Sequence, residues 1–194
     1  MKKSVVILLV SFLFVFSLVG CGDNSSSGNN GGDNNTSSGD SSAITGETYS
    51  VGDFSVLVPD GWEYSPFYDS GGTEAVSNIL AVHRGSNADY ISGKIPGIQI
   101  NYLGPGGSPA SPRFYDDPED IAPVTIGQHT WEGFSAYMAY SGTESTPVTI
   151  LWTTIDGTLI QISATTLLGK KDQTEHPALD DPELSAIIAS IALE

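Results

Sequence analysis

The feature that most constrains the fold of this chain is a pair of apolar, β-branched segments separated by a two-residue loop. Residues 148–155 and 158–165 flank Asp156-Gly157, a loop that favours a type I′ β-hairpin. The loop sets the register, so that Leu151 lies opposite Ile162. One face of the hairpin then carries four apolar residues that we expect in the core: Leu151, Ile155, Ile160 and Ile162.

The opposite face of this hairpin is also apolar, since it carries Ile150, Trp152 and Leu159. A sheet that is apolar on both faces needs cover on both, and helices are the obvious cover. Alternation with a period of two predicts further strands over residues 54–58, 62–64, 78–84, 98–102 and 131–140. Pro59-Asp60-Gly61 predicts the turn between the first two of these strands.

An amphipathic helix is expected near the C-terminus, where Leu184, Ile187, Ile188 and Ile191 form an apolar stripe. The preceding Asp180-Asp181-Pro182-Glu183 favours a helix start, because acidic residues cap helices and proline fits the first turn. The same four letters at residues 116–119 predict a shorter helical turn that ends near Pro123. Residues 104–112, rich in Gly and Pro, predict a long irregular loop that is either a mobile flap or a binding rim.

The segment from Phe54 to Trp62, Phe-Ser-Val-Leu-Val-Pro-Asp-Gly-Trp, is similar to the start of Mog1/PsbP-like domains. The Asp-Gly hairpin, the terminal helix and the Ser190-Ile191 ending also resemble that family. The resemblance implies one α+β domain over residues 46–194, an antiparallel β-sheet with helices packed on its faces as an α/β/α sandwich. We expect the middle helix to be short or missing, with one sheet face partly open. The family hosts binding and assembly roles, and no catalytic residues carry over.

The N-terminus has the pattern of an export signal. Lys2 and Lys3 precede an apolar run over residues 5–19, which is shorter than the about 20 residues that a membrane-spanning helix needs. The run ends in Leu18-Val19-Gly20-Cys21, which resembles the lipobox of bacterial lipoproteins. The resemblance implies a signal peptide over residues 1–20, cleavage before Cys21, and acyl chains such as palmitate on this cysteine. The alternative is a plain cleaved signal with an incidental cysteine.

Residues 21–45 predict a disordered tether. Gly, Ser, Asn and Asp dominate this segment, which has no aromatic residue to offset the entropy of ordering. A flexible coil of this length spans about 25–30 Å, enough to hold a domain off a bilayer. Signal and tether together predict an exported protein that is anchored to the cell membrane by lipid and faces outside the cytoplasm.

The charge of the chain limits its partners. The formal net charge is −16, and loss of the signal peptide with its two lysines makes it −18. Such a surface repels phosphate backbones, so we expect no nucleic-acid binding. It also gains nothing from anionic lipid, so the membrane link must be the lipid on Cys21. Cys21 is the only cysteine, so no disulfide can form within the chain.

No catalytic residues and no cofactor are predicted, because the sequence holds no nucleophile elbow, zinc-protease motif or phosphate loop. The histidines His83, His129 and His176 lie tens of residues apart. A zinc site could assemble from them in space, but we interpret them as scattered surface or edge residues. The chain is therefore not expected to be an enzyme.

Two acidic clusters are the candidate metal ligands. Calcium takes oxygen ligands at such density, and the residues concerned are Asp116, Asp117, Glu119 and Asp120, with Asp180, Asp181 and Glu183 separately. Neither cluster has the alternating spacing and glycine of a calcium loop. We therefore interpret both clusters as helix caps and predict no metal site.

Two aromatic pairs in loop-like sequence, Phe67-Tyr68 and Phe114-Tyr115, are the candidate partner-binding residues. The favoured function is a non-catalytic binding or assembly module for another envelope protein or surface component. The alternative is a small-molecule or carbohydrate receptor, or a hydrolase, on the cell surface. A polar pocket that gathers histidines and acidic residues would favour the alternative, whereas an apolar patch near these aromatic pairs would favour protein binding.

Overall fold

Antiparallel strands make up most of the computed structural model, which describes residues 44–68, 75–141, 144–171 and 174–194. These residues belong to one compact unit. The predictions on residues 1–20, on Cys21 and on the tether up to residue 43 lie outside the described residues. The elements are β1 (Gly46–Val51), β2 (Phe54–Pro59), β3 (Trp62–Tyr68), β4 (Ala75–Arg84), α1 (Asn87–Ile91), β5 (Gly97–Gly104), the 3-10 turn η1 (Pro112–Phe114), β6 (Asp116–Ile126), β7 (His129–Ser141), β8 (Glu144–Ile155), β9 (Thr158–Thr165), β10 (Gly169–Lys170), α2 (Pro182–Ala189) and β11 (Ala192–Leu193).

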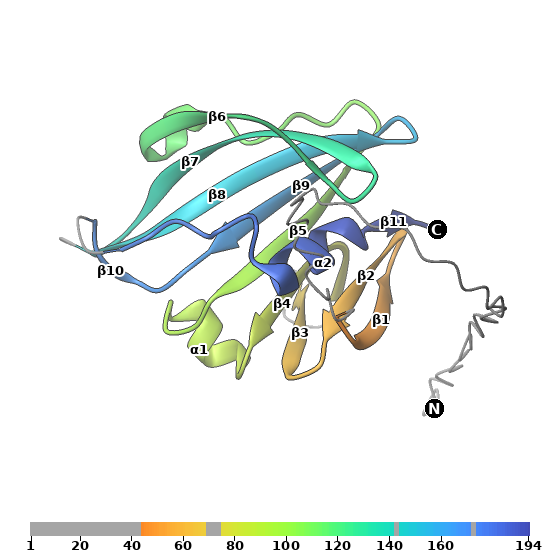
Figure 1. Ribbon diagram of the computed structural model, residues 1–194, viewed down its shortest axis with the longest axis horizontal. Coiled ribbons are helices and arrows are strands. Elements are labelled where there is room, and N and C mark those ends of the chain that lie inside the picture. The colour runs from red at the N-terminus through yellow and green to blue at the C-terminus, as the bar shows by residue number, and fades with distance from the viewer. Residues whose placement is uncertain (1–43, 69–74, 142–143, 172–173) are drawn as a thin grey trace, which may run out of the picture. The chain divides into compact units, whose positions relative to one another are not determined.

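The strands form two antiparallel sheets (Figure 1). The larger has eight strands in the order β3-β4-β5-β9-β8-β7-β6, with β10 paired to β8. The smaller has the order β1-β2-β11, so that the C-terminal strand returns to the first hairpin. The sequence prediction of an antiparallel sheet is confirmed, although within the described residues the helices are few and short.

The central hairpin has the predicted register. β8 pairs with β9 so that Leu151 lies opposite Ile162 and Ile155 opposite Thr158. Asp156 and Gly157 have φ angles of 48° and 82°, as a type I′ turn requires at both central positions. The predicted core row of this hairpin is buried, with at most 7% of any of its four side chains exposed.

The helix α2 lies between the two sheets (Figure 1). Its buried side chains, Leu184, Ile187 and Ile188, belong to the same hydrophobic cluster as the core rows of β8 and β9. The Asp181 side chain caps the helix by accepting hydrogen bonds from the backbone N–H groups of Glu183 and Leu184, at 3.1 and 2.9 Å. The predicted helix and its acidic cap are therefore confirmed, whereas Ile191, the last residue of the predicted stripe, is buried but lies beyond the end of the helix.

The opposite face of the eight-stranded sheet holds a second, smaller hydrophobic cluster around Phe134 and Ile150. The Gly/Pro-rich loop lies over this cluster, because Ala110 and Tyr115 pack against it. The Ala110 N–H also donates a 2.6 Å hydrogen bond to Oε1 of Gln161. The predicted irregular loop therefore lies on the sheet, and its role as a mobile flap or a binding rim stays a prediction.

The predicted helical turn at residues 116–119 is wrong, because these residues begin strand β6. β6 is the last strand of the larger sheet, so its outer edge pairs with no strand of the described residues. Its pairing with β7 shifts register between Asp116 and Glu119 and between Ile121 and Val124. Pro118 and Pro123 lie at these two irregularities. An edge strand tolerates proline there, since no ladder hydrogen bond is lost.

Candidate functional site

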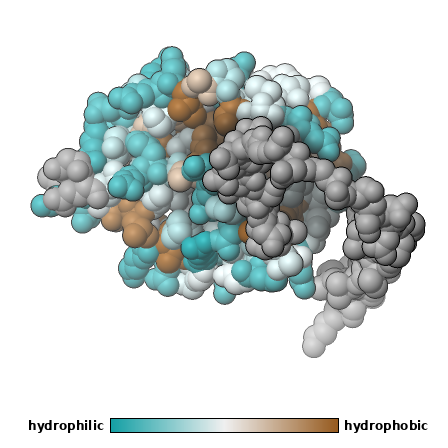
Figure 2. All heavy atoms as spheres, viewed as in Figure 1, coloured by the Kyte–Doolittle hydropathy of each residue, from teal (hydrophilic) through white to brown (hydrophobic). Residues whose placement is uncertain are grey.

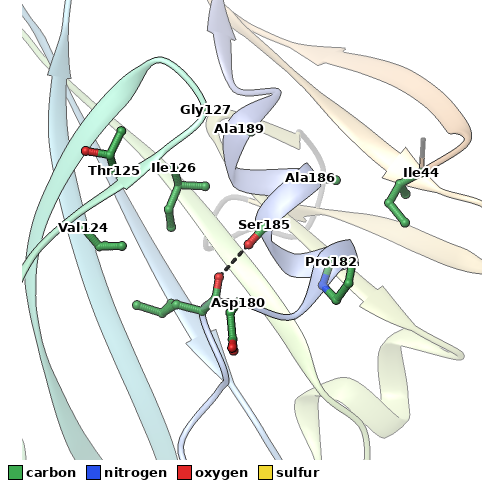
Figure 3. A pocket seen from close by; sticks show the side chains of 11 residues that line it. Ile44, Val124, Thr125, Ile126, Gly127, Asp180, Pro182, Ser185, Ala186 and Ala189 are labelled. Carbon is green, nitrogen blue, oxygen red and sulfur yellow. Dashed lines mark hydrogen bonds between the residues drawn. The ribbon is translucent and has the colours of Figure 1, made fainter. Parts of the chain in front are cut away.

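A hollow of about 770 Å³ opens beside α2, and most of its lining is apolar. Its walls come from the end of β6, from residues 179–189 and from Ile44 at the start of the described chain. Figure 3 shows Val124 and Ile126 on the β6 side, facing the helix that carries Ser185, Ala186 and Ala189. Figure 2 shows a few small groups of hydrophobic residues on this face, within a largely hydrophilic surround. We call this hollow the α2 groove.

Small side chains shape the α2 groove. Gly127, at a φ of 63°, lets the turn after β6 approach the end of α2, and a Cβ there would lie 2.8 Å from the Cβ of Ala189. Ser185 does not offer a free hydroxyl to the groove, because its Oγ donates to the Leu179 carbonyl at 2.6 Å. Asp180 is the one charged residue among the lining. The groove therefore presents apolar contact area with little hydrogen-bonding capacity.

The predicted calcium candidates Asp116, Asp117, Glu119 and Asp120 lie along β6 and are exposed. Their interpretation as helix caps is wrong, because the strand replaces the helical turn. Asp117 instead pairs with Lys171 and adopts a φ of 44° at the first irregularity of the strand. Within the described ranges no group of three or more His, Cys, Asp or Glu side chains could hold a metal ion.

Two of these carboxylates, Asp117 and Glu119, line a polar hollow of about 520 Å³ together with Ser135, Tyr137, Lys171 and His176. His176 contacts Tyr137 edge-on at 4.8 Å, and the Lys171 ammonium lies 5.0 Å from the same ring. The hydrogen bond from Lys171 to Asp117 raises the pKa of the lysine, which therefore stays charged. Nδ1 of His176 is buried and has no hydrogen-bond partner in the described part of the chain. This hollow gathers one predicted histidine with two predicted acidic residues.

The prediction that all three histidines lie at the surface or at edges is wrong for His83, which is 0% exposed. Its Nδ1 lies 3.0 Å from the Gly85 carbonyl, which can only accept, so Nε2 accepts from Ser65 Oγ at 2.8 Å. Burial lowers the pKa of His83 and keeps the ring neutral. β4 is an interior strand, and Tyr90 of α1 stacks on this ring at 5.0 Å. The Ser65–His83 pair therefore lies beneath α1.

The two predicted aromatic pairs do not come together as one surface. Phe114 is 73% exposed at η1, whereas Tyr115 packs edge-on against Phe134 at 5.4 Å, and burial raises its pKa. Phe67 is half-buried on β3, and the side chain of Tyr68 lies outside the described part of the structure. Only Phe114 of the four has the exposure expected of a recognition residue in the described structure.

Sequence reasoning missed the residues that line the α2 groove. A signal was present, because Pro182, Ala186 and Ala189 recur at helical spacing on the side of α2 away from its buried stripe. Small residues at such spacing are equally typical of a solvent-facing side, so they do not indicate a groove by themselves. Their partners, Val124 and Gly127, are remote in sequence, and no local pattern joins them to the helix.

No family model matches this chain, and no curated protein sequence matches it. Among solved structures it is similar to a protein of Bacteroides thetaiotaomicron, with 13% identity and a TM-score of 0.46. That match covers 77% of this chain but only 48% of the other, so the chain spans about half of that protein. It is also similar to LpqN of Mycobacterium tuberculosis, a protein involved in cell envelope biogenesis, with 12% identity, a TM-score of 0.39 and coverages of 77% and 91%. At TM-scores below 0.5 neither likeness establishes a shared fold.

The described helices are also too short or too polar to cross a bilayer.

Proposed function

We propose that this chain is an exported lipoprotein whose domain binds another envelope protein without catalysing a reaction. The observation that carries the proposal is the α2 groove, which offers about 770 Å³ of mainly apolar volume beside a helix. Exposed apolar hollows on a soluble domain mark binding surfaces, because leaving them open to water is unfavourable. The export signal and the tether support a role in which the domain reaches a partner from a membrane.

The occupant of the groove is an apolar segment of a basic protein. Residues 44–194 contain five basic and twenty acidic side chains, a formal charge of −15. A surface of this charge repels acidic proteins and steers basic ones toward it. The groove supplies apolar contact area, and the surrounding carboxylates select partners with basic flanks.

We also infer that the domain is a reduced form of the Mog1/PsbP-like sandwich. α2 supplies the cover on one face, and α1 with the loop over residues 105–115 stands in place of the middle helix on the other. An experimental structure that superposes on a Mog1/PsbP-like domain over the whole larger sheet would support this assignment. A strand order different from that of the family would refute it.

Cross-linking from native membranes tests the binding function. A photo-reactive amino acid at Val124, on the groove wall, should capture one basic protein in the full-length, membrane-bound chain. Ala186→Lys should abolish this capture, because it places a cation on the groove wall against a basic partner. Ala88→Lys is the matched control, since it adds the same charge to an exposed alanine of α1 and should leave capture unchanged. Equal capture in both variants, or capture of no basic protein, would overturn the proposal.

Lipid attachment at Cys21 is tested separately. Mass spectrometry of the membrane fraction should find an acylated N-terminal cysteine on the mature chain. Cys21→Ser should release the protein from the membrane or leave it unprocessed. A Cys21→Ser protein that stays in the membrane with its apolar segment uncut would make that segment a signal anchor instead.

The polar hollow around Lys171 favours a second candidate function, a receptor for a small polar molecule. A thermal-shift screen of small polar solutes tests it, because a solute at 100 times its Kd stabilises by about 2.7 kcal/mol. A stabilising solute should lose its effect in Lys171→Met and keep it in Lys170→Met, which removes the neighbouring exposed charge. If the solute still stabilised both variants, this hollow would be excluded as its binding site.

A further inference from the structure

Most of the exposed large apolar side chains in the described structure lie on one face of the eight-stranded sheet. Across the described residues these side chains are 44–73% exposed, and they are Tyr64, Ile91, Phe114, Met138 and Leu167. Met138 lies on the same face of β7 as Phe134, because side chains alternate along a strand. Phe134 belongs to the second hydrophobic cluster, on the face opposite α2, which we call the outer face. Tyr64 lies on the other face, since it pairs with Val82 of the main core.

The helix α1 packs on the outer face. Tyr90 of α1 stacks on His83 at 5.0 Å, and a Cβ at Gly97 would lie 2.5 Å from the Tyr90 ring. His83 and Gly97 are neighbours, along their strands, of residues in the main core, so both belong to the outer face. Ile91, the last residue of α1, is 66% exposed. The helix therefore adds an apolar side chain that is open to solvent on this face.

Two irregular segments add further apolar side chains to the outer face. Leu167 is next to Leu168, whose N–H donates a 2.8 Å hydrogen bond to the Gly93 carbonyl in the turn after α1. Phe114 belongs to η1, at the end of the Gly/Pro-rich loop that lies on the second hydrophobic cluster. Four separate elements therefore each present one exposed large apolar side chain on this face: α1, η1, β7 and the segment after β9.

The four side chains have the arrangement that a lipid surface accepts. None of them lines the α2 groove or the polar hollow. A protein ligand needs a matching shape, whereas the interface of a bilayer takes up separate apolar side chains. Long basic side chains lie beside them and can keep their charges among the headgroups: Lys94 follows α1, and the Arg113 guanidinium lies 4.7 Å from the centre of the Phe114 ring. Asp89 pairs with Lys94 at 3.5 Å, so the face has no strong positive charge and needs no anionic lipid.

We propose that the outer face rests on a lipid bilayer, with the four exposed apolar side chains inserted among the headgroups. The proposal depends on the membrane anchoring in the proposed function. A flexible tether that spans about 25–30 Å holds the domain at a high effective concentration near the bilayer, so a weak contact is enough to orient it. Because α2 lies on the opposite face of the sheet, this orientation leaves the α2 groove turned away from the lipid and open to a partner.

Photo-cross-linking to lipid tests the orientation. The full-length protein, purified from membranes, is reconstituted into vesicles of pure phosphatidylcholine, with a photo-reactive amino acid at position 91, 167 or 64. Mass spectrometry should find at least about tenfold more lipid adduct at positions 91 and 167 than at position 64, which is exposed on the other face. Equal adduct at positions 64 and 91, or adducts that appear only when anionic lipid is added, would overturn the proposal.

Two double variants test whether the apolar side chains cause the contact. Ile91→Asp with Leu167→Asp should reduce lipid adducts of a photo-reactive amino acid at position 114 about tenfold, because charged side chains leave the interface. Ala178→Asp with Ala192→Asp is the matched control, since it adds the same charge at two exposed positions outside α1, η1, β7 and the segment after β9. Melting curves should match that of the unmodified protein in both. Equal adducts in the two double variants would refute the role of these side chains.

Flotation of the same vesicles separates this proposal from the proposed function. A protein that floats with the vesicles but forms no adducts at positions 91 and 167 is anchored without resting on the outer face, which would overturn only this proposal. A protein that does not float would overturn both the anchoring and the orientation. Capture of a basic partner from position 124 should persist in Ile91→Asp with Leu167→Asp, because the α2 groove lies on the other face of the sheet.

Discussion

The same four letters, Asp-Asp-Pro-Glu, begin two different structures in this protein. At residues 180–183 they lead into the helix α2, with Asp181 as its cap and Pro182 in its first turn. At residues 116–119 they lead into the edge strand β6, where Asp117 adopts a φ of 44° and Pro118 lies at an irregularity in the pairing. A local cap signal is therefore compatible with both outcomes.

The residues after each tetrapeptide account for the difference. The second copy precedes an apolar stripe at helical spacing, and burying this stripe against the sheet stabilises the helix. The first copy precedes Ile121, Pro123 and Val124, where a second proline disfavours a helix interior and the remaining residues pair with β7. The comparison teaches that cap residues permit a helix, while tertiary burial decides whether one forms.

The largest expected difference in stability comes from the apolar side chains that follow each copy in the sequence. Ile188→Ala should lower the free energy of unfolding by about 2–5 kcal/mol, because this side chain is fully buried in the core beneath α2. Ile121 follows the first copy and is only half-buried on the edge strand, so Ile121→Ala should lower the free energy of unfolding by less. Chemical denaturation of both variants measures this. Equal losses would show that the edge strand is anchored as firmly as the helix.

The backbone of the first copy gives the next largest effect. Asp117→Val should destabilise by about 1–2 kcal/mol, since a β-branched residue is strained at a φ of 44°. Asp117→Asn removes the same pairing with Lys171 but tolerates this φ, so it should retain most of the stability. The difference in denaturant midpoint between these two variants measures how much the backbone conformation at residue 117 contributes to stability. A midpoint for Asp117→Val equal to that of Asp117→Asn would contradict the strained conformation.

The cap of the second copy should contribute somewhat less. Asp181→Ala should destabilise by about 1 kcal/mol, because the N–H groups of Glu183 and Leu184 lose their acceptor. Asp180→Ala, one residue earlier and exposed, should stay within about 0.5 kcal/mol of the unmodified protein. Thermal melts at matched ionic strength compare them. A larger loss of stability for Asp180→Ala than for Asp181→Ala would show that Asp180, and not Asp181, caps the helix.

The smallest effect belongs to the ion pair of the first copy. Lys171→Met removes the partner of Asp117, and the melting temperature should change less than in any variant above, because exposed ion pairs are screened by water and salt. The remaining difference should vanish as the salt concentration rises. A salt-independent loss of stability would indicate that Lys171 packs on Tyr137 rather than acting through its charge.

Much of the sheet could be predicted from local patterns, whereas the arrangement of the candidate sites could not. The β8–β9 hairpin, its Asp-Gly turn and the core row that includes Leu151 follow from a period of two and from turn chemistry. His83 could not be placed this way, because its burial depends on Tyr90 of α1 stacking above it. The α2 groove and the polar hollow both combine segments that are distant in sequence.

By itself, the sequence determined the antiparallel hairpins, the position and capping of α2, and the strongly acidic charge of this protein. These features depend on residues within a few positions of one another, where backbone geometry and side-chain periodicity act directly. Only the tertiary structure decided the fate of the first Asp-Asp-Pro-Glu segment, the burial of His83 and the residues that meet at each hollow. Their free energies come from contacts between distant segments, such as Gly127 with Ala189 or Tyr49 with Tyr64, which no local pattern encodes.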